Sequence, residues 1–442
     1  MNKYTGRTGG FTGSPRAVRL PMTVAALSLL CGAASTTAAD FEAPPEQSPA
    51  ALLPSNMVAG KNFSIVDPVQ DDGLMHRYVI DSRFGRFEAY GRSNLEIRVH
   101  EVAALTELAS TSDIKLVANG VEQGVGNQVH TVIGVATNPI GTVTGIPKGI
   151  AHLFSGVGAQ GQEALAQGRR LVKASGDSGS SQEADKTADA AKEFAAQYFG
   201  LTHTEMRWYK KLGVDPYTDN VALRNAIRSN ARVEAAASFG MRFAGLPQLP
   251  GIGLMERASD AIYNENPAAV RARARKILSG YGLSPTEIET WQNSKALSPT
   301  RQVLLLAAAE ALTGVEGRGE LFRHALGLTS NAEAEVYLQS VALLLQVHRT
   351  QPLSAILPGL RLPTARRADG RIVVCGAFES VYWTEDVATG EAQVRQSLPA
   401  GVSTPDLWVT GSVSERARSE LQQRGWELHE FVSGPVAKTT QD

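Results

Sequence analysis

The sequence predicts a multi-domain α+β fold that is predominantly α-helical, with a central helical bundle and small α/β elements at both ends. Its 442 residues exceed what one hydrophobic core usually serves, which indicates more than one domain. Helix start signals recur through residues 189–360, whereas strand-like stretches are concentrated before and after this region. These observations place the bundle in the middle of the chain.

Shifts in proline, glycine and serine content and in apolar periodicity set the expected boundaries. We expect a signal peptide at 1–39, a Pro/Ala-rich spacer at 40–60, a hairpin-plus-helix unit at 61–112, a glycine-rich apolar segment at 113–174, a linker at 175–188, a helical domain at 189–360, a small α/β domain at 361–434 and a tail at 435–442. The hairpin-plus-helix unit is too small to be stable alone, so it must dock on another part of the chain.

The first 39 residues indicate where the protein works. A basic lead, a short apolar core and small residues follow one another: Lys3, Arg7, Arg16 and Arg19, then Val24 to Ala34, then Thr37 and Ala39. This order is typical of a cleaved secretory signal. We therefore expect export to the periplasm or out of the cell, with membrane association left open, and a mature chain that begins at Asp40. Cys31 offers a lipoprotein alternative, but the residue before it, Leu30, is large for that route.

Charge and cysteine content argue against a nucleic-acid binder and against a disulfide-stabilised fold. The formal net charge of -1 argues against a nucleic-acid binder held by bulk electrostatics. Only Cys375 remains once the signal is removed, so we expect no internal disulfide. Cys375 lies in a predicted strand, Arg371–Phe378, where a small buried apolar residue is a better interpretation than a nucleophile.

The unit at 61–112 has the pattern of a β-hairpin followed by a helix. Tyr78–Ile80 and Phe87–Tyr90 flank a turn at Ser82–Gly85. Asn94 is suited to cap a helix in which an apolar residue recurs every three or four positions. These apolar positions are Leu95, Val99, Val102, Leu105 and Leu108.

The segment at 113–174 is apolar and rich in glycine, and two interpretations of it are open. In one, residues 117–172 lie at a membrane surface or against an envelope protein. The contact residues would then be Ile140, Ile146, Lys148, Ile150, Leu153 and Phe154. In the other, the segment packs on the helical domain and its glycines allow a close approach of the backbone.

The region at 189–360 carries several helix start signals. Capping boxes are predicted at Thr202–Glu205, Ser284–Glu287 and Ser330–Glu333. Two stretches, Val303–Leu306 and Leu343–Leu345, are apolar beyond one helix face. We expect the helices that contain them to be central to the bundle.

The unit at 361–434 has the order strand, helix, strand. Predicted strands at Arg371–Phe378, Val381–Trp383 and Leu407–Thr410 precede a capping box at Ser412–Glu415, and Trp426–Val432 then returns as a strand. Short joints between these elements favour a βαβ unit with a right-handed crossover.

No catalytic, metal-binding or cofactor-binding motif is evident in the sequence. The histidines lack the spacing of a zinc motif, and no phosphate-binding glycine loop is present, so we expect no cofactor and no metal. The weak catalytic candidates are His203 and Glu205, near Trp208 and the turn at Asp215–Tyr217, although Glu205 already has a capping role.

Two functions are therefore compatible with the sequence. The first is an exported, envelope-associated protein with a structural or interaction role, peripheral to a membrane through residues 117–172. The alternative is an exported hydrolase-like enzyme whose site is assembled from residues distant in sequence. The alternative predicts a concave site where titratable groups converge and shift one another's pKa.

Fractionation of cells that express the C-terminally tagged chain tests the predicted export. We expect the tagged protein in the exported fraction, with an N-terminal sequence that begins at Asp40. Tagged protein that stays in the cytoplasm with residues 1–39 attached would contradict the prediction. Retention through a carbonate wash, with Cys31 as the first residue, would instead indicate the lipoprotein route.

Overall fold

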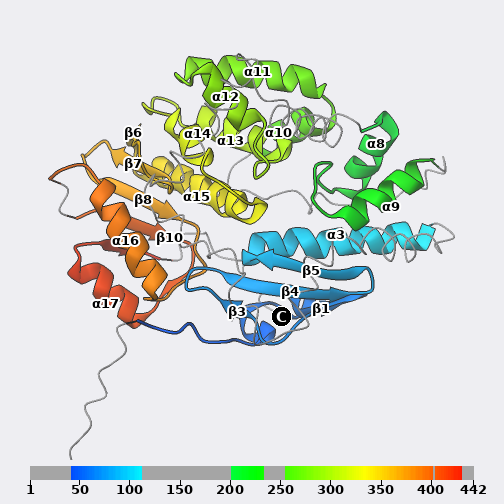
Figure 1. Cartoon of the computed structure of the whole chain (residues 1–442), viewed down its shortest axis with the longest axis horizontal. Helices are drawn as coiled ribbons and strands as arrows, with labels where there is room; N and C mark the ends of the chain where they lie inside the picture. The colour runs from blue at the N-terminus through cyan, green and yellow to red at the C-terminus, as the bar shows by residue number, and fades with distance from the viewer. Residues whose placement is uncertain (1–40, 112–200, 233–253, 402–403, 431–442) are drawn as a thin grey trace, which may run out of the picture. The chain divides into compact units, whose positions relative to one another are not determined.

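The computed structural model describes residues 41–111, 201–232, 254–401 and 404–430 (Figure 1). The predicted signal peptide, the whole glycine-rich segment, the linker and the tail lie outside these residues. Within the part described, the chain is a mixed α+β structure with 51% helix, 18% strand and three sheets among 13 helices. The predicted central helical bundle with small α/β elements at the ends is therefore wrong.

The physical reason is that the main helices pack on sheets as well as on one another. Helix α15 (Asn331–Thr350) contacts strand β8 (Ile372–Gly376), and helix α3 (Gly91–Thr111) contacts both strands of the N-terminal hairpin. One continuous cluster of buried apolar side chains runs from Leu74 to Trp426. The helices consequently share a core with the sheets and do not form a bundle of their own.

The N-terminal sheet has the order β1-β2-β4-β3, with β5 paired to β4. Its strands are β1 (Ala59–Gly60), β2 (Phe63–Ile65), β3 (Gln70–Asp71), β4 (His76–Ser82) and β5 (Gly85–Tyr90). The predicted hairpin is present, because β4 and β5 are antiparallel and meet at Ser82 and Gly85. Helix α3 starts at Gly91, earlier than predicted, and the Asn94 side chain donates to the Tyr90 carbonyl instead of capping the helix.

The stretch at 40–60 is more than a spacer. It contains two short helices, α1 (Pro49–Leu52) and α2 (Ser55–Val58). Leu53 is buried against the N-terminal sheet, and the Glu42 amide donates to the Trp383 carbonyl at 2.8 Å. This stretch therefore connects the N-terminal sheet to the C-terminal part of the chain.

The helices between the sheets are α8 (His203–Leu212), α9 (Val221–Arg232), α10 (Leu254–Tyr263), α11 (Pro267–Gly280), α12 (Pro285–Gln292), α13 (Pro299–Ala311), α14 (Glu320–Ala325) and α15. Reciprocal capping boxes form at Thr202 and Ser284, as predicted. At Ser330 the hydroxyl accepts the Glu333 amide, but the Glu333 carboxylate binds Thr329 as well as the Ser330 hydroxyl. Helices α13 and α15 are largely buried, as their broad apolar stretches indicate, but what they are central to is a mixed α+β core and not a helical bundle.

The C-terminal sheet has the order β12-β10-β8-β7-β6, and β9 pairs with β11 in a separate ribbon. The elements are β6 (Leu353–Ile356), β7 (Thr364–Arg367), β8, β9 (Ser380–Val381), α16 (Glu385–Ser397), β10 (Asp406–Val409), β11 (Ser412–Val413), α17 (Glu415–Gln423) and β12 (Glu427–His429). Strands β8, β10 and β12 are parallel, which confirms the predicted strand–helix–strand unit. The sequence analysis missed α16, β6 and β7. Cys375 is buried and unpaired, as predicted.

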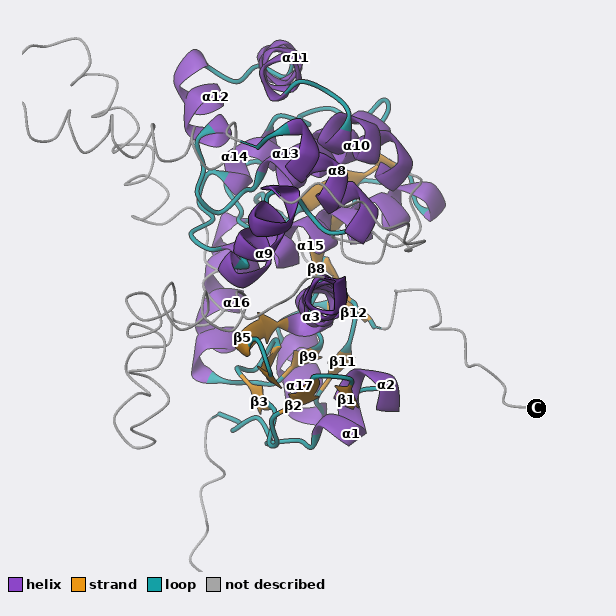
Figure 2. Cartoon of the chain, turned by 90° about the vertical axis from the view of Figure 1, so that its right-hand side faces the viewer, coloured by secondary structure: helices purple, strands orange, loops and turns teal. Residues whose placement is uncertain are grey.

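Helix α3 lies between the N-terminal strands on one side and helices α9 and α15 on the other (Figure 2).

Backbone hydrogen bonds make a second link between the N-terminal and C-terminal parts, in addition to the bond between Glu42 and Trp383. The amides of Glu379 and Ser380 donate to the Leu74 carbonyl at 3.0 and 3.2 Å. Within the described residues, no helix is long and apolar enough to cross a membrane.

Replacement of Ser340 tests how strongly α15 is fastened to the C-terminal sheet. Its buried hydroxyl donates to the Val336 carbonyl at 2.7 Å and accepts the Ala377 amide at 2.8 Å, just after β8. Ser340→Ala leaves this buried amide without its partner, which should lower the free energy of unfolding by about 1–3 kcal/mol. Urea denaturation measures the change, with exposed Ser279→Ala on α11 as the control. Equal stability of the two variants would contradict the assignment.

Candidate functional site

A partly open cavity of about 270 Å³ is lined by four parts of the chain that are distant in sequence. These parts are the β5–α3 region, the loop between α8 and α9, helix α13 and the first residues of α15. Its charged wall residues are Glu88, Arg98, Glu101, Asp215, Asp219 and Arg301. A concave site with several convergent polar and titratable groups is the usual place for a ligand.

One side of the cavity is a saturated network around Glu101. This carboxylate is 1% exposed and accepts hydrogen bonds from Arg98 at 2.8 Å, from Asn220 at 3.0 Å and from the Thr218 hydroxyl. Arg98 also pairs with Asp219. Because its donors surround it, Glu101 is a structural group that holds α3 to the loop before α9.

Asp215 is the least compensated acid on the wall. It is 5% exposed, and its Oδ1 accepts the Tyr217 amide at 2.9 Å and the Thr300 hydroxyl at 2.6 Å. Burial raises the pKa of Asp215 to about 6, although these two hydrogen bonds act in the opposite direction. The carboxyl group therefore exchanges its proton near neutral pH.

Arg301 lies on the same wall and is 9% exposed. Its Nε donates to the Glu335 carboxylate at 3.1 Å. The side-chain amide of Gln339 donates to the other oxygen of that carboxylate at 3.0 Å. Among the residues that the structure describes, the two terminal nitrogens of Arg301 have no hydrogen-bond partner. The positive charge of Arg301 acts on Asp215, but the two side chains form no ion pair. A donor group and an acceptor group thus border the cavity without satisfying each other.

The sequence candidates His203 and Glu205 do not line this cavity. His203 is exposed at the first residue of α8. Glu205 is buried in the capping box and also accepts from Arg228 at 3.2 Å, while Trp208 packs in the core. Of the proposed group, only Asp215 reaches the cavity. The predicted membrane or partner contacts Ile140, Ile146, Lys148, Ile150, Leu153 and Phe154 lie outside the described residues.

Sequence reasoning missed Arg98, Glu101 and Arg301. Arg98 and Glu101 are three residues apart and share a helix face with Leu105 and Leu108, so a charged pair falls on an apolar stripe. This pattern was a usable signal for a buried polar network. Arg301 gave no such signal, because an arginine in the first turn after a capping serine is also common in solvent-exposed helices.

One cluster has the residue types of a metal centre. Asp406, Glu427 and His429 lie close together, and His429 Nε2 is 3.9 Å from Asp406 Oδ1 and 3.8 Å from Glu427 Oε1. Arg371 bridges both carboxylates, and Arg367 binds Asp406 at 3.1 Å. Two guanidinium groups already neutralise this cluster, and they would repel a cation. It is therefore better explained as an ionic tie between the C-terminal strands.

The raised pKa of Asp215 predicts a specific pH dependence. The folded chain holds this proton more tightly than the unfolded chain, so stability should fall as pH rises from about 4 through about 6, by about 3 kcal/mol at most. Asp215→Asn keeps the Oδ1 acceptor and removes the charge, so it should remove this fall and stabilise the protein at neutral pH. Urea denaturation across this range measures both effects. Exposed Asp81→Asn is the matched control, and a variant that is less stable than wild type at neutral pH would contradict the argument.

Comparisons with known proteins add no further indication of function. The chain matches no protein-family model, no curated protein and no solved structure among those with which it was compared. Its function must be argued from the chemistry of its own residues.

Proposed function

We propose that the protein binds a small, neutral, polyhydroxylated ligand of the sugar class in the cavity between Asp215 and Arg301. The observation that carries this proposal is a pair of buried groups with unused hydrogen-bonding capacity on one wall. Buried residues normally have their polar atoms paired, so unpaired atoms of two buried residues that border a cavity call for a functional explanation, and a ligand supplies one. Asp215 also opposes folding at neutral pH, which is typical of a residue kept for function.

Hydroxyl groups suit this wall because they both donate and accept. An ionised carboxylate only accepts and a guanidinium only donates, so one hydroxyl can bond to Asp215 and to Arg301 at once. Carboxylates outnumber guanidinium groups around the cavity, which disfavours an anionic ligand. A cationic ligand would meet the charge of Arg301. A neutral ligand avoids both penalties.

The size and surface of the cavity agree with one small ligand. A volume of about 270 Å³ is below the range of larger cofactor pockets. Tyr90 also lines the cavity and adds an aromatic residue to its wall. Aromatic rings of this kind pack against apolar faces of ligands while their hydroxyl stays in a polar environment.

Binding is favoured over the hydrolase-like alternative. Glycoside hydrolysis requires two carboxyl groups in separate roles, one of them available to act on water or on substrate. Asp215 has a suitable pKa for an acid, but each of the other wall carboxylates already has a partner. Glu101 is held by three side chains, Asp219 by Arg98 and Asn331, and Glu88 by Arg77. A binding role also suits an exported protein, and the N-terminal sequence predicts export.

Calorimetric titration with matched probes tests the proposal. Neutral hexoses, pentoses and disaccharides are compared with glucuronate and glucosamine, which place an anion or a cation on the same ring. We expect a neutral sugar to bind, and Arg301→Lys and Asp215→Asn each to weaken it about tenfold or more, because a hydrogen bond to a charged group contributes about 1.5–3 kcal/mol. Arg301→Lys keeps a cation beside Glu335, and exposed Arg275→Lys is its control.

Two outcomes would contradict this function. One is binding of glucuronate or glucosamine alone, which would show that charge and not hydroxyl recognition selects the ligand. The other is neutral-sugar binding that both variants leave unchanged, which would place the ligand elsewhere. Loss of binding in Asp215→Asn is not explained by unfolding if that variant is the more stable protein.

A further inference from the structure

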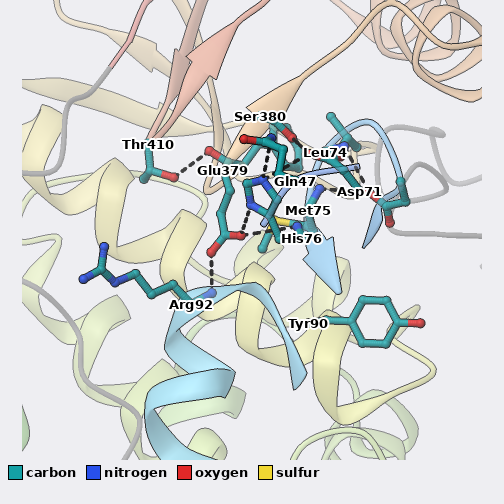
Figure 3. Close-up of polar contacts among 12 residues, drawn as sticks. Gln47, Asp71, Leu74, Met75, His76, Tyr90, Arg92, Glu379, Ser380 and Thr410 are labelled. Atoms are coloured by element: carbon teal, nitrogen blue, oxygen red, sulfur yellow. Dashed lines mark hydrogen bonds and ion pairs between the residues drawn. The ribbon is translucent and has the colours of Figure 1, made fainter. Parts of the chain in front are cut away.

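A second buried polar cluster lies where the N-terminal sheet meets the C-terminal part of the chain (Figure 3). His76, the first residue of β4, is 7% exposed and lies between two carboxylates. Its Nδ1 is 2.8 Å from Glu379 Oε2, and its Nε2 is 3.3 Å from Asp71 Oδ2. The Ser380 hydroxyl donates to Asp71 at 2.6 Å. A histidine with an acid at each ring nitrogen thus joins residues about 300 positions apart.

Glu379 holds the start of helix α3 as well. Its Oε2 accepts the His76 backbone amide at 3.3 Å, and its Oε1 accepts the Arg92 amide in the first turn of α3. A negative charge at this end of a helix is also favoured by the helix dipole. One side chain from the C-terminal part therefore fixes both β4 and α3.

The cluster covers the carboxyl edge of the parallel strands β8 and β10. Glu379 follows β8, and Thr410, which follows β10, donates to the Phe378 carbonyl at 2.8 Å. This edge is where open α/β sheets present their functional loops. Here residues 71–76 lie on it, and the backbone bonds to Leu74 and Gly73 continue the contact.

Protonation decides how well this arrangement is satisfied. A neutral imidazole has a single N–H, so only one ring nitrogen can donate to a carboxylate. The other nitrogen is then an acceptor that faces a second acceptor, and no hydrogen bond forms there. The charged ring donates to both carboxylates. Burial by itself lowers the pKa of His76, but the hydrogen bond to Glu379 and the charges of Glu379, Asp71 and Asp72 together raise it above 6.5. Gln47 and Tyr78 also lie against the ring, and both are uncharged.

We propose that His76, Asp71 and Glu379 form a pH-responsive clamp that fastens residues 71–76 to the carboxyl edge of the C-terminal sheet. The clamp is closed while His76 is protonated and loosens when the ring loses its proton. Its contribution to stability is complete below about pH 6.5, the ordinary pKa, and is lost as pH rises through the raised pKa. This inference does not depend on the proposed ligand.

Hydrogen exchange with mass spectrometry tests the clamp, because it measures how often the backbone amides that bond to Leu74 and Gly73 become exposed to solvent. The reporter peptide is 377–383, which contains the Glu379, Ser380 and Tyr382 amides that bond to Leu74 and Gly73, and a peptide within α13 is the internal reference. After correction for the intrinsic rate, we expect reporter exchange to rise about tenfold between about pH 6 and about pH 8.5. His76→Gln, which cannot ionise, should show no such rise. Exposed His203→Gln should behave as wild type.

A second variant keeps the test decisive if His76→Gln does not fold. Glu379→Gln keeps one acceptor oxygen and removes the charge, so the ring titration of His76, followed by NMR of histidine-labelled protein, should move to lower pH. The reporter peptide should then open at lower pH as well. Equal pH profiles in wild type and His76→Gln, or an unmoved His76 titration in Glu379→Gln, would overturn the clamp.

Discussion

The carboxylate of Glu379 is the contact on which the arrangement of the N-terminal sheet, α3 and the C-terminal sheet depends. A buried carboxylate is stable only when donors surround it. Here the donors come from His76 and from the Arg92 amide, 303 and 287 positions earlier in the chain. Satisfying this one group therefore closes a very long loop and, together with the backbone bonds to Leu74 and Gly73, holds the two sheets against each other. The shared apolar core from Leu74 to Trp426 then adds the larger part of the stabilisation.

The requirement that buried charges have hydrogen-bond partners also explains the two sides of the cavity, where one carboxylate has its partners and another acid and an arginine do not. Glu101 has its donors and acts as a structural tie, whereas Asp215 and Arg301 are buried beside each other without pairing. The difference lies in which elements meet at this point. The loop before α9 can reach Glu101, but α13 places Arg301 where only its Nε meets a carboxylate. The saturated side of the cavity is thus part of the fold, and the unsaturated side is available for a ligand.

Local chemistry explains why individual helices could be predicted while the bundle could not. Capping boxes at Thr202 and Ser284 depend on residues three positions apart, and they form as the sequence indicates. The partner of a helix face depends on residues far away. The broad apolar surface of α15 indicated burial, but it did not indicate that α13 and strand β8 would both cover it. The result is a mixed α+β core.

The sequence by itself determined the hairpin around Ser82–Gly85, the helix starts at Thr202, Ser284 and Ser330, the parallel strand–helix–strand unit and the burial of Cys375, because turns, caps and alternation act over a few residues. It also identified the Asp215 turn, though not its role. Only the tertiary structure decided that Asp215 faces Arg301 and that His76 lies between Asp71 and Glu379. The reason is physical: a pKa shift or an unsatisfied donor arises from burial and from neighbours, and neither is set by positions along the chain.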